Sequence, residues 1–126
     1  MRIQCDLSYP MTRPAALRLG VPARGMLAHR TLAQLLAPDR LVPGRRREVD
    51  VLLAWGRRPS ALRVERLARQ WDLPVWHLED GLLRSVAKGR EHPPLALLVD
   101  ELGVHFDATA PSRIEQLIAA PITVTE

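Results

Sequence analysis

Hydrophobic residues are spaced most regularly in the middle of the chain. Residues 51–55, Val-Leu-Leu-Ala-Trp, form a short continuous apolar run, which is typical of a parallel strand covered on both faces. Gly-Arg-Arg-Pro at 56–59 interrupts this run. Ser60 then provides an N-cap for a helix that extends to about Trp71. The apolar side chains expected to share one face of that helix are Leu62, Val64, Leu67, Ala68 and Trp71.

A second apolar run follows the helix. Leu73-Pro74 ends the helix, and residues 75–78, Val-Trp-His-Leu, predict another strand that delivers Glu79 and Asp80 at its end. The order strand, helix, strand predicts a βαβ unit with a parallel sheet. The fold class is therefore α/β.

The last third of the chain predicts a hairpin and a helix. Residues 95–100 and 104–106 read as two strands, and the three residues between them are few enough for a hairpin turn. Asp100, Glu101 and Asp107 are explained by turn chemistry around that hairpin. Ser112 and Glu115 then form a capping-box pair that opens a final helix.

The first third of the chain has little periodicity. It is rich in proline, and its one expected element is a short helix over residues 31–37, capped by Thr31 and Gln34. We therefore expect three parts: a poorly defined N-terminal segment (1–48), an α/β domain (49–120) and a truncated end (121–126). One βαβ unit and one hairpin make fewer strands than a usual doubly wound sheet, so we expect a fragment.

Length, charge and cysteine content exclude several classes of protein. At 126 residues the chain holds one domain at most. No apolar run approaches the roughly 20 residues of a membrane-spanning helix, and the N-terminus lacks the apolar core of a signal peptide, so we expect a cytoplasmic protein. Cys5 is the single cysteine, which excludes an intrachain disulfide. The net charge of +4 fits anionic partners, but dispersed arginines and few aromatic residues argue against nucleic acid as a partner.

The candidate chemistry lies in residues 79–85, Glu-Asp-Gly-Leu-Leu-Arg-Ser. Open α/β sheets bind ligands at the carboxyl ends of their strands, and paired carboxylates can divide general acid and base roles. Glu79 and Asp80 are therefore the catalytic candidates. Neighbouring strand residues point to opposite faces, so only one of them should face a given cleft. The alternative is a solvated strand end in which Asp80 and Gly81 form an ordinary turn.

The candidate substrate-binding residues are arginines and a hydroxyl near these strand ends. Arg84 and Ser85 can bind a phosphate or a carboxylate, and Arg57 lies between a strand and a helix N-terminus, where anions bind well. The alternative for the arginines is a solvated surface position. His77 is read as a core or edge histidine rather than a catalytic base, and the histidines lack the spacing of a metal site.

Four ordered strings carry a resemblance to a known family. They are Trp-Gly-Arg-Arg-Pro-Ser (55–60), Glu-Asp-Gly-Leu-Leu-Arg-Ser (79–85), Pro-Pro-Leu-Ala-Leu-Leu-Val-Asp-Glu-Leu-Gly (93–103) and Phe-Asp-Ala-Thr-Ala-Pro-Ser-Arg-Ile-Glu (106–115). Over roughly residues 49–118 the chain resembles the bacterial capsule polysaccharide biosynthesis and export family, whose characterised members look like retaining β-Kdo transferases.

The resemblance implies both an architecture and an activity. It implies a partial Rossmann-like lobe of the glycosyltransferase-B type, with no metal or other cofactor and with CMP-Kdo as the donor substrate. Kdo would pass to a lipid-linked saccharide acceptor, at the inner face of the cytoplasmic membrane. Glu79 would be the acid/base, Arg84 and Ser85 would shape the same pocket, and the carboxylate nucleophile would lie beyond Glu126.

Three readings of function remain open at this point. The leading one is a fragment of a Kdo transferase, which we expect to be inactive alone. The second is a non-catalytic interaction module, or a truncated remnant, that docks with a separate partner. The third, a basic nucleic-acid-binding domain, is favoured only by the pI of about 10.5.

Overall fold

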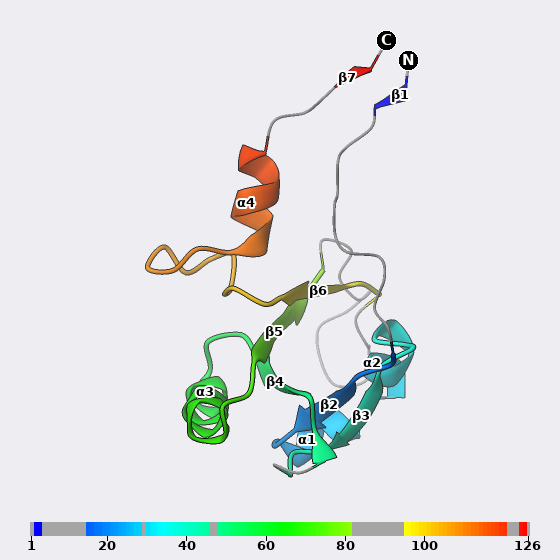
Figure 1. Ribbon diagram of the computed structural model, residues 1–126, viewed down its shortest axis with the longest axis vertical. Helices are drawn as coiled ribbons and strands as arrows, with labels where there is room; N and C mark the ends of the chain where they lie inside the picture. The colour runs from blue at the N-terminus through cyan, green and yellow to red at the C-terminus, as the bar shows by residue number, and fades with distance from the viewer. Residues whose placement is uncertain are drawn as a thin grey trace.

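The protein is built around a mixed β-sheet with helices on both of its faces (Figure 1). The computed structural model describes residues 2–3, 15–28, 30–45, 48–81, 95–120 and 124–125. The strands of the main sheet are β2 (Arg18–Val21), β3 (Arg40–Pro43), β4 (Val51–Trp55), β5 (Val75–Asp80) and β6 (Leu97–Asp100). The helices are α1 (Arg24–Leu27), α2 (Arg30–Leu35), α3 (Pro59–Trp71) and α4 (Arg113–Ala119). A small separate pair joins β1 (Arg2–Ile3) to β7 (Val124–Thr125).

The strand order is that of a doubly wound α/β sheet. The order is β3-β2-β4-β5-β6; the first four strands are parallel, and β6 runs antiparallel to β5. The second strand of the main sheet thus flanks the first on one side, and the later strands are added on the other side. This arrangement confirms the predicted α/β class and the Rossmann-like lobe.

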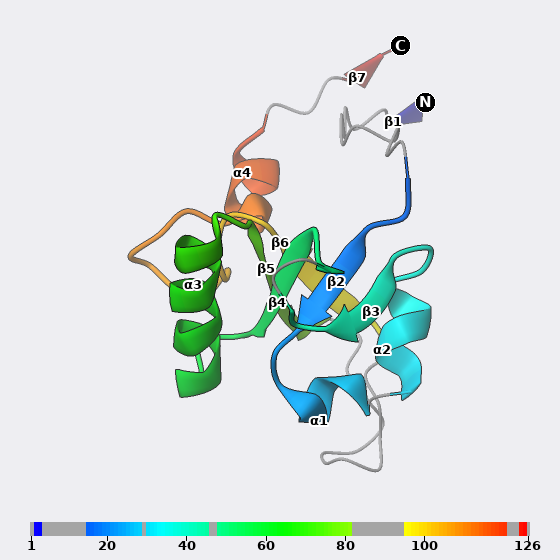
Figure 2. The same cartoon turned by 60° about the horizontal axis from the view of Figure 1, so that its bottom comes forward.

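Two apolar clusters cover the opposite faces of the sheet. Figure 2 shows α3 on one side of the sheet and α1 and α2 on the other. On the α1–α2 side, the strands and α2 bury a cluster that includes Leu19, Leu32, Leu53 and Leu78. On the α3 side, Leu52 and Ala54 pack with the inner face of α3. Strand β4 is therefore covered on both faces, as its unbroken apolar run predicts.

Helix α3 occupies the predicted place but begins differently. Its N-cap is Arg58, whose side chain makes no capping hydrogen bond, and Pro59 occupies the first turn. The prediction that Ser60 caps the helix is wrong, because a proline preset for helical geometry begins the helix before it. The inner face is formed by Ala61, Val64 and Ala68. Leu62, predicted to lie on that face, is 39% exposed.

The predicted hairpin at residues 95–106 is wrong in its second half. Strand β6 forms, but residues 104–106 are not a strand, and β6 pairs with β5 instead. The Asp100 carboxylate accepts hydrogen bonds from the backbone N–H groups of Leu102 (2.9 Å), Gly103 (3.1 Å) and Arg113 (2.6 Å). These bonds turn the chain away from β6 and towards α4, and they confirm the turn chemistry expected of Asp100.

Helix α4 begins with the predicted capping box. The Ser112 hydroxyl accepts a hydrogen bond from the Glu115 N–H (3.2 Å), and the Glu115 carboxylate accepts one from the Ser112 N–H (2.8 Å). Each residue thereby satisfies a donor that the first helical turn leaves unpaired. No residue of α4 is buried, however, so the helix covers its part of the sheet only loosely.

The segment before residue 49 contributes more than the expected short helix. It supplies β2 and β3, which extend the sheet across that boundary, together with α1 and α2. Helix α2 begins at Arg30 and ends at Leu35, so Thr31 lies within the helix and not at its cap. The main sheet therefore has five strands, and the expectation of a sheet with fewer strands is wrong.

Candidate active site

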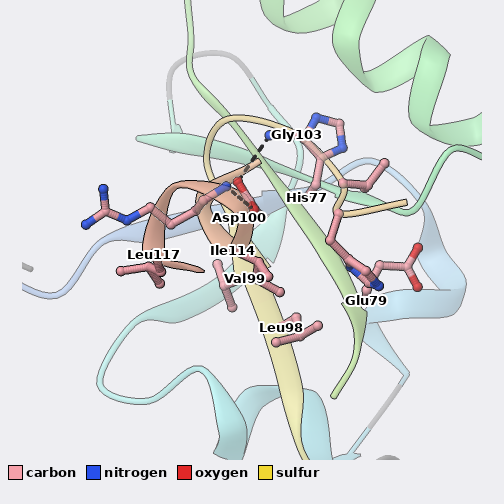
Figure 3. A pocket seen from close by; sticks show the side chains of 11 residues that line it. His77, Glu79, Leu98, Val99, Asp100, Gly103, Ile114 and Leu117 are labelled. Atoms are coloured by element: carbon pink, nitrogen blue, oxygen red, sulfur yellow. Dashed lines mark hydrogen bonds between the residues drawn. The ribbon is translucent and has the colours of Figure 1, made fainter. Parts of the chain in front are cut away.

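A pocket of about 140 Å³ lies between β5, β6 and α4. In Figure 3, His77 and Glu79 project from β5, while Leu98 and Val99 of β6 and Ile114 and Leu117 of α4 form much of the remaining wall. The polar lining residues are His77, Glu79, Asp100, His105 and Arg113. The pocket therefore combines an apolar wall with a few polar groups, which is the usual composition of a small-molecule site.

The alternation along β5 separates Glu79 from Asp80. Trp76 and Leu78 belong to the cluster on the α1–α2 side of the sheet. Because successive strand residues point to opposite faces, His77 and Glu79 lie on the α3 side. Glu79 lines the pocket and Asp80 does not. The structure thus places one of the two adjacent carboxylates in the candidate site, as the pattern predicts; the catalytic role of either residue stays a prediction.

The Glu79 carboxylate lies against the loop that follows β4. Gly56 in that loop has a φ of +56°, and a Cβ atom added to it would collide with Oε1 of Glu79. The Gly56 N–H also donates a hydrogen bond of 3.0 Å to the Leu78 carbonyl. Glycine is therefore favoured here by its backbone conformation, and the absence of a side chain leaves room for the flexible Glu79 carboxylate.

Arg57 follows Gly56 and pairs with two carboxylates of the protein. Its Nη2 lies 3.0 Å from Oδ2 of Asp107, and its Nη1 lies 3.8 Å from Oε1 of Glu65. The Asp107 and Glu65 side chains are 11% and 19% exposed, and that of Arg57 is 43% exposed. This ion-pair cluster ties the loop after β4 to α3 and to the loop before α4. The role of Arg57 in binding substrate stays a prediction.

The surroundings of Asp107 keep its carboxyl group ionised. Hydrogen bonds from the hydroxyl and the N–H of Thr109 lower the pKa of Asp107, and the charge of Arg57 lowers it further. Asp107 and Glu65 are parts of the site that the sequence does not reveal. Glu65 is eight residues from Arg57 and Asp107 is fifty residues from it, and neither spacing indicates an ion pair.

His77 lies at the boundary between the ion-pair cluster and the pocket. Its side chain is 11% exposed, and its Nε2 lies 3.9 Å from Oε1 of Glu65. Its Nδ1 is buried and has no hydrogen-bond partner among the described residues. The sequence predicts a core or edge histidine, which the burial fits, but it does not indicate that the ring also lines a pocket.

Three further expectations from the sequence concern two substrate-binding residues, metal binding and membrane-spanning helices. Arg84 and Ser85 lie outside the described residues. Within the described part of the chain, no group of three or more His, Cys, Asp or Glu side chains could hold a metal ion. No described helix has the length and apolar character needed to cross a membrane.

Comparisons with known proteins give a consistent assignment. Residues 50–126 match the family described as "Capsule polysaccharide biosynthesis protein". The "Capsule polysaccharide modification protein LipA" of Neisseria meningitidis serogroup B is 36% identical over 105 residues. The "Lipopolysaccharide-processing protein LpsZ" of Rhizobium meliloti is 51% identical over 55 residues, which are 43% of this chain and 12% of that protein.

A solved structure supports the same assignment at the level of the fold. The chain is similar to "Thermosulfurimonas dismutans KpsC, beta Kdo 2,4 transferase", with a TM-score of 0.71 and 37% sequence identity over 82% of this chain. The matched part is 33% of the KpsC chain, and the match to LipA covers 82% of this chain and 15% of LipA. The chain thus spans a minor part of each of these relatives.

Proposed function

This chain belongs to the capsule polysaccharide biosynthesis protein family, and from that membership we propose that it forms part of a glycosyltransferase. The proposed reaction moves Kdo from CMP-Kdo to a lipid-linked saccharide acceptor. The name of the structural relative, a β-Kdo transferase, supports this choice of sugar. The activity of the larger relatives is carried to this chain as a proposal, because the chain matches only a part of them.

One observation carries the proposal: Glu79 lies in a pocket at the carboxyl end of a parallel strand. This is where open α/β sheets bind their ligands. We assign the acid/base role to Glu79 alone, because Asp80 lies on the opposite face of β5. In a retaining transfer by double displacement, a carboxylate first displaces CMP from the sugar. Glu79 would then take the proton of the acceptor hydroxyl as that oxygen attacks the anomeric carbon and breaks its bond to the carboxylate nucleophile, which leaves as the free carboxylate.

A second carboxylate must serve as the nucleophile in such a mechanism. Asp100 is the other carboxylate that lines the pocket, but its oxygens accept three backbone hydrogen bonds and hold the turn before α4. We therefore assign Asp100 a structural role. We propose that the nucleophile comes from outside the described pocket residues.

The partners follow from the same proposal. A nucleotide sugar and a lipid-linked saccharide would be the two substrates, and the lipid would keep the reaction at the inner face of the cytoplasmic membrane. Arg57 is suited to contact an anionic group of a substrate, because it follows Gly56, which borders the Glu79 carboxylate, and because its side chain is 43% exposed. Arg84 and Ser85 remain proposed substrate contacts.

A chimeric enzyme tests the proposal. The segment of KpsC that matches this chain would be replaced by the chain, and Kdo transfer from CMP-Kdo to a Kdo-terminated lipid acceptor would be measured. We expect transfer by the chimera. Substitution Glu79→Gln should lower kcat by about 10²- to 10⁴-fold, the usual contribution of a general acid or base.

The matched control is Asp80→Asn, which removes a neighbouring carboxylate from the other face of β5. It should retain transfer within a few-fold of the unsubstituted chimera. A folded chimera without transfer, or equal losses in the two variants, would contradict the proposal.

A non-catalytic interaction module is the second candidate function. The observation that favours it is the exposure of apolar side chains around α4 and β6, with Val99, Leu117 and Ile118 exposed by 39%, 38% and 79%. Such a module would need no acid/base, so Glu79→Gln would leave Kdo transfer by the chimera unchanged.

A further inference from the structure

The geometry points to a second polar contact in the Glu79 pocket. We propose that Nδ1 of His77 accepts a hydrogen bond from a hydroxyl group of the bound saccharide, and that Glu65 orients the imidazole ring for this contact. The class of ligand rests on the proposed function. The identity of the residue rests on the contacts of β5 and α3.

One ring nitrogen of His77 has no hydrogen-bond partner among the described residues. The side chain is 11% exposed, and this nitrogen, Nδ1, is buried. Buried polar atoms in proteins are nearly always hydrogen-bonded, and an unpaired one costs free energy. Because His77 lines the pocket, a ligand in that pocket can provide the missing partner.

The other ring nitrogen of His77 lies towards a carboxylate of α3. Nε2 lies 3.9 Å from Oε1 of Glu65, which is beyond hydrogen-bond distance, and the same oxygen lies 3.8 Å from Nη1 of Arg57. An ionised carboxylate attracts an N–H proton electrostatically at this distance, so it favours the tautomer with the proton on Nε2. In that tautomer Nδ1 carries a lone pair and must accept its hydrogen bond. The complementary ligand group is a donor such as a sugar hydroxyl.

His77 and Glu79 both line the pocket from β5. The two residues are two apart on β5 and share one face, so their Cα atoms are separated by about 6.6 Å. Hydroxyl groups surround a sugar ring, and a single ring can therefore reach both side chains. Glu79 would contact the reacting end of the acceptor or donor, and His77 would select a ligand with a hydroxyl group nearby.

Two substitutions distinguish a ligand contact from a structural role. The side-chain oxygen of Asn lies close to the position of Nδ1 in histidine, whereas the longer Gln side chain reaches the position of Nε2. His77→Asn therefore keeps an acceptor for the ligand and loses the contact with Glu65. His77→Gln does the reverse. The two variants have similar polarity, so burial affects them alike.

The measurement is the dissociation constant of Kdo for the 126-residue chain, followed by the shifts of backbone amide signals in NMR spectra. We expect His77→Gln to raise the dissociation constant about three- to tenfold, the worth of one neutral hydrogen bond. His77→Asn should stay within about twofold of the unsubstituted chain. Asp80→Asn, on the opposite face of β5, serves as the control, and thermal unfolding of each variant confirms that it folds.

The ring itself gives a second readout. In the chain labelled with ¹⁵N-histidine, we expect the His77 proton on Nε2 and an Nδ1 signal that moves when Kdo is added. Glu65→Gln should produce a mixture of the two tautomers. A role confined to packing would move neither signal.

Each outcome supports or overturns the inference. Weak binding by His77→Asn with normal binding by His77→Gln would show that the ring acts through Glu65 alone, and would overturn it. Kdo-induced shifts at Glu79 that are insensitive to both His77 variants would overturn it and leave the proposed function standing. Absence of any shift at saturating Kdo would also overturn it. The proposed function would still be tested separately, by Kdo transfer by the chimera.

Discussion

The face of the sheet under α1 and α2 is closed by apolar side chains, whereas the face under α3 and α4 is interrupted by polar ones. On the first face, Leu19, Leu53 and Leu78 are fully buried. On the second, His77 and Glu79 border a pocket, and α4, which also lines this pocket, has no buried residue. Both faces use the same strand, β5, in alternate positions.

This difference indicates a division of labour between the two faces. Well-packed leucines hold β5 in place from one side and leave its other side free to present polar groups at fixed positions. A rigid strand positions functional side chains more accurately than a loop does. The loosely covered β6–α4 region can then vary or move without loss of the scaffold.

The largest effect is expected from the closed face. Leu78→Ala removes a side chain with 0% exposure and should lower the free energy of unfolding by about 2–5 kcal/mol. Ile118→Ala in α4, where the side chain is 79% exposed, should change it by about 0.5 kcal/mol or less. Urea unfolding measures both, and similar losses in the two variants would remove the distinction between the faces.

The next effect concerns the loop that supports Glu79. Gly56→Ala places a side chain at a φ of +56° and against the Glu79 carboxylate, so it should cost about 1–2 kcal/mol and displace that carboxylate. Gly25→Ala is the matched control, because a Cβ at this helical position meets no atom within 4 Å. It should be neutral or stabilising by up to about 1 kcal/mol. A destabilisation by Gly25→Ala as large as that of Gly56→Ala would count against the role of Gly56.

A smaller effect is expected at the start of α4. Ser112→Ala removes the capping box and should cost about 1 kcal/mol. Ser60→Ala, in the first turn of α3 where Arg58 is the N-cap, should cost about 0.5 kcal/mol or less. Thermal unfolding of both variants measures these costs. If Ser60→Ala lowered stability as much as Ser112→Ala, Ser60 would act as the N-cap that the sequence predicts.

The smallest effect is a loss of stability in acid, and it arises from Asp50, which precedes β4 and pairs with Arg18 of β2. Hydrogen bonds from the Arg18 guanidinium and N–H lower the pKa of Asp50 from 3.8 to about 2. A carboxyl group with a lowered pKa contributes stability above its unfolded value, and that stability is lost as the pH falls from about 4 through about 2. Unfolding of Asp50→Asn should therefore depend less on pH in this window. An unchanged acid dependence would contradict the assignment.

The sequence predicts the β4–α3–β5 unit well because its elements have strong local signals. An unbroken apolar run forms β4, and helical spacing forms α3. Strands β2 and β3 have weaker local signals, because Arg18–Val21 contains a glycine and Arg40–Pro43 ends in proline. The pairing of β2 with both β3 and β4 overrides these weak local preferences. The hairpin was predicted wrongly because a spacing rule cannot foresee that Asp100 binds the N–H of Arg113.

The candidate site divides in the same way. Alternation along a strand is local, so the separation of Glu79 from Asp80 could be predicted. The contacts of Arg57 with Asp107 and of His77 with Glu65 join different secondary-structure elements, and no pattern in the sequence predicts them. The fold creates these contacts when it brings the strand ends together.

The central claim is that Glu79, and not Asp80, faces the bound sugar. A crystal structure of the chain soaked with Kdo tests it most directly. We expect density for the sugar between β5, β6 and α4, with a hydroxyl group within hydrogen-bond distance of the Glu79 carboxylate. Sugar bound on the α1–α2 side of the sheet beside Asp80, or an empty pocket at saturating Kdo, would contradict it.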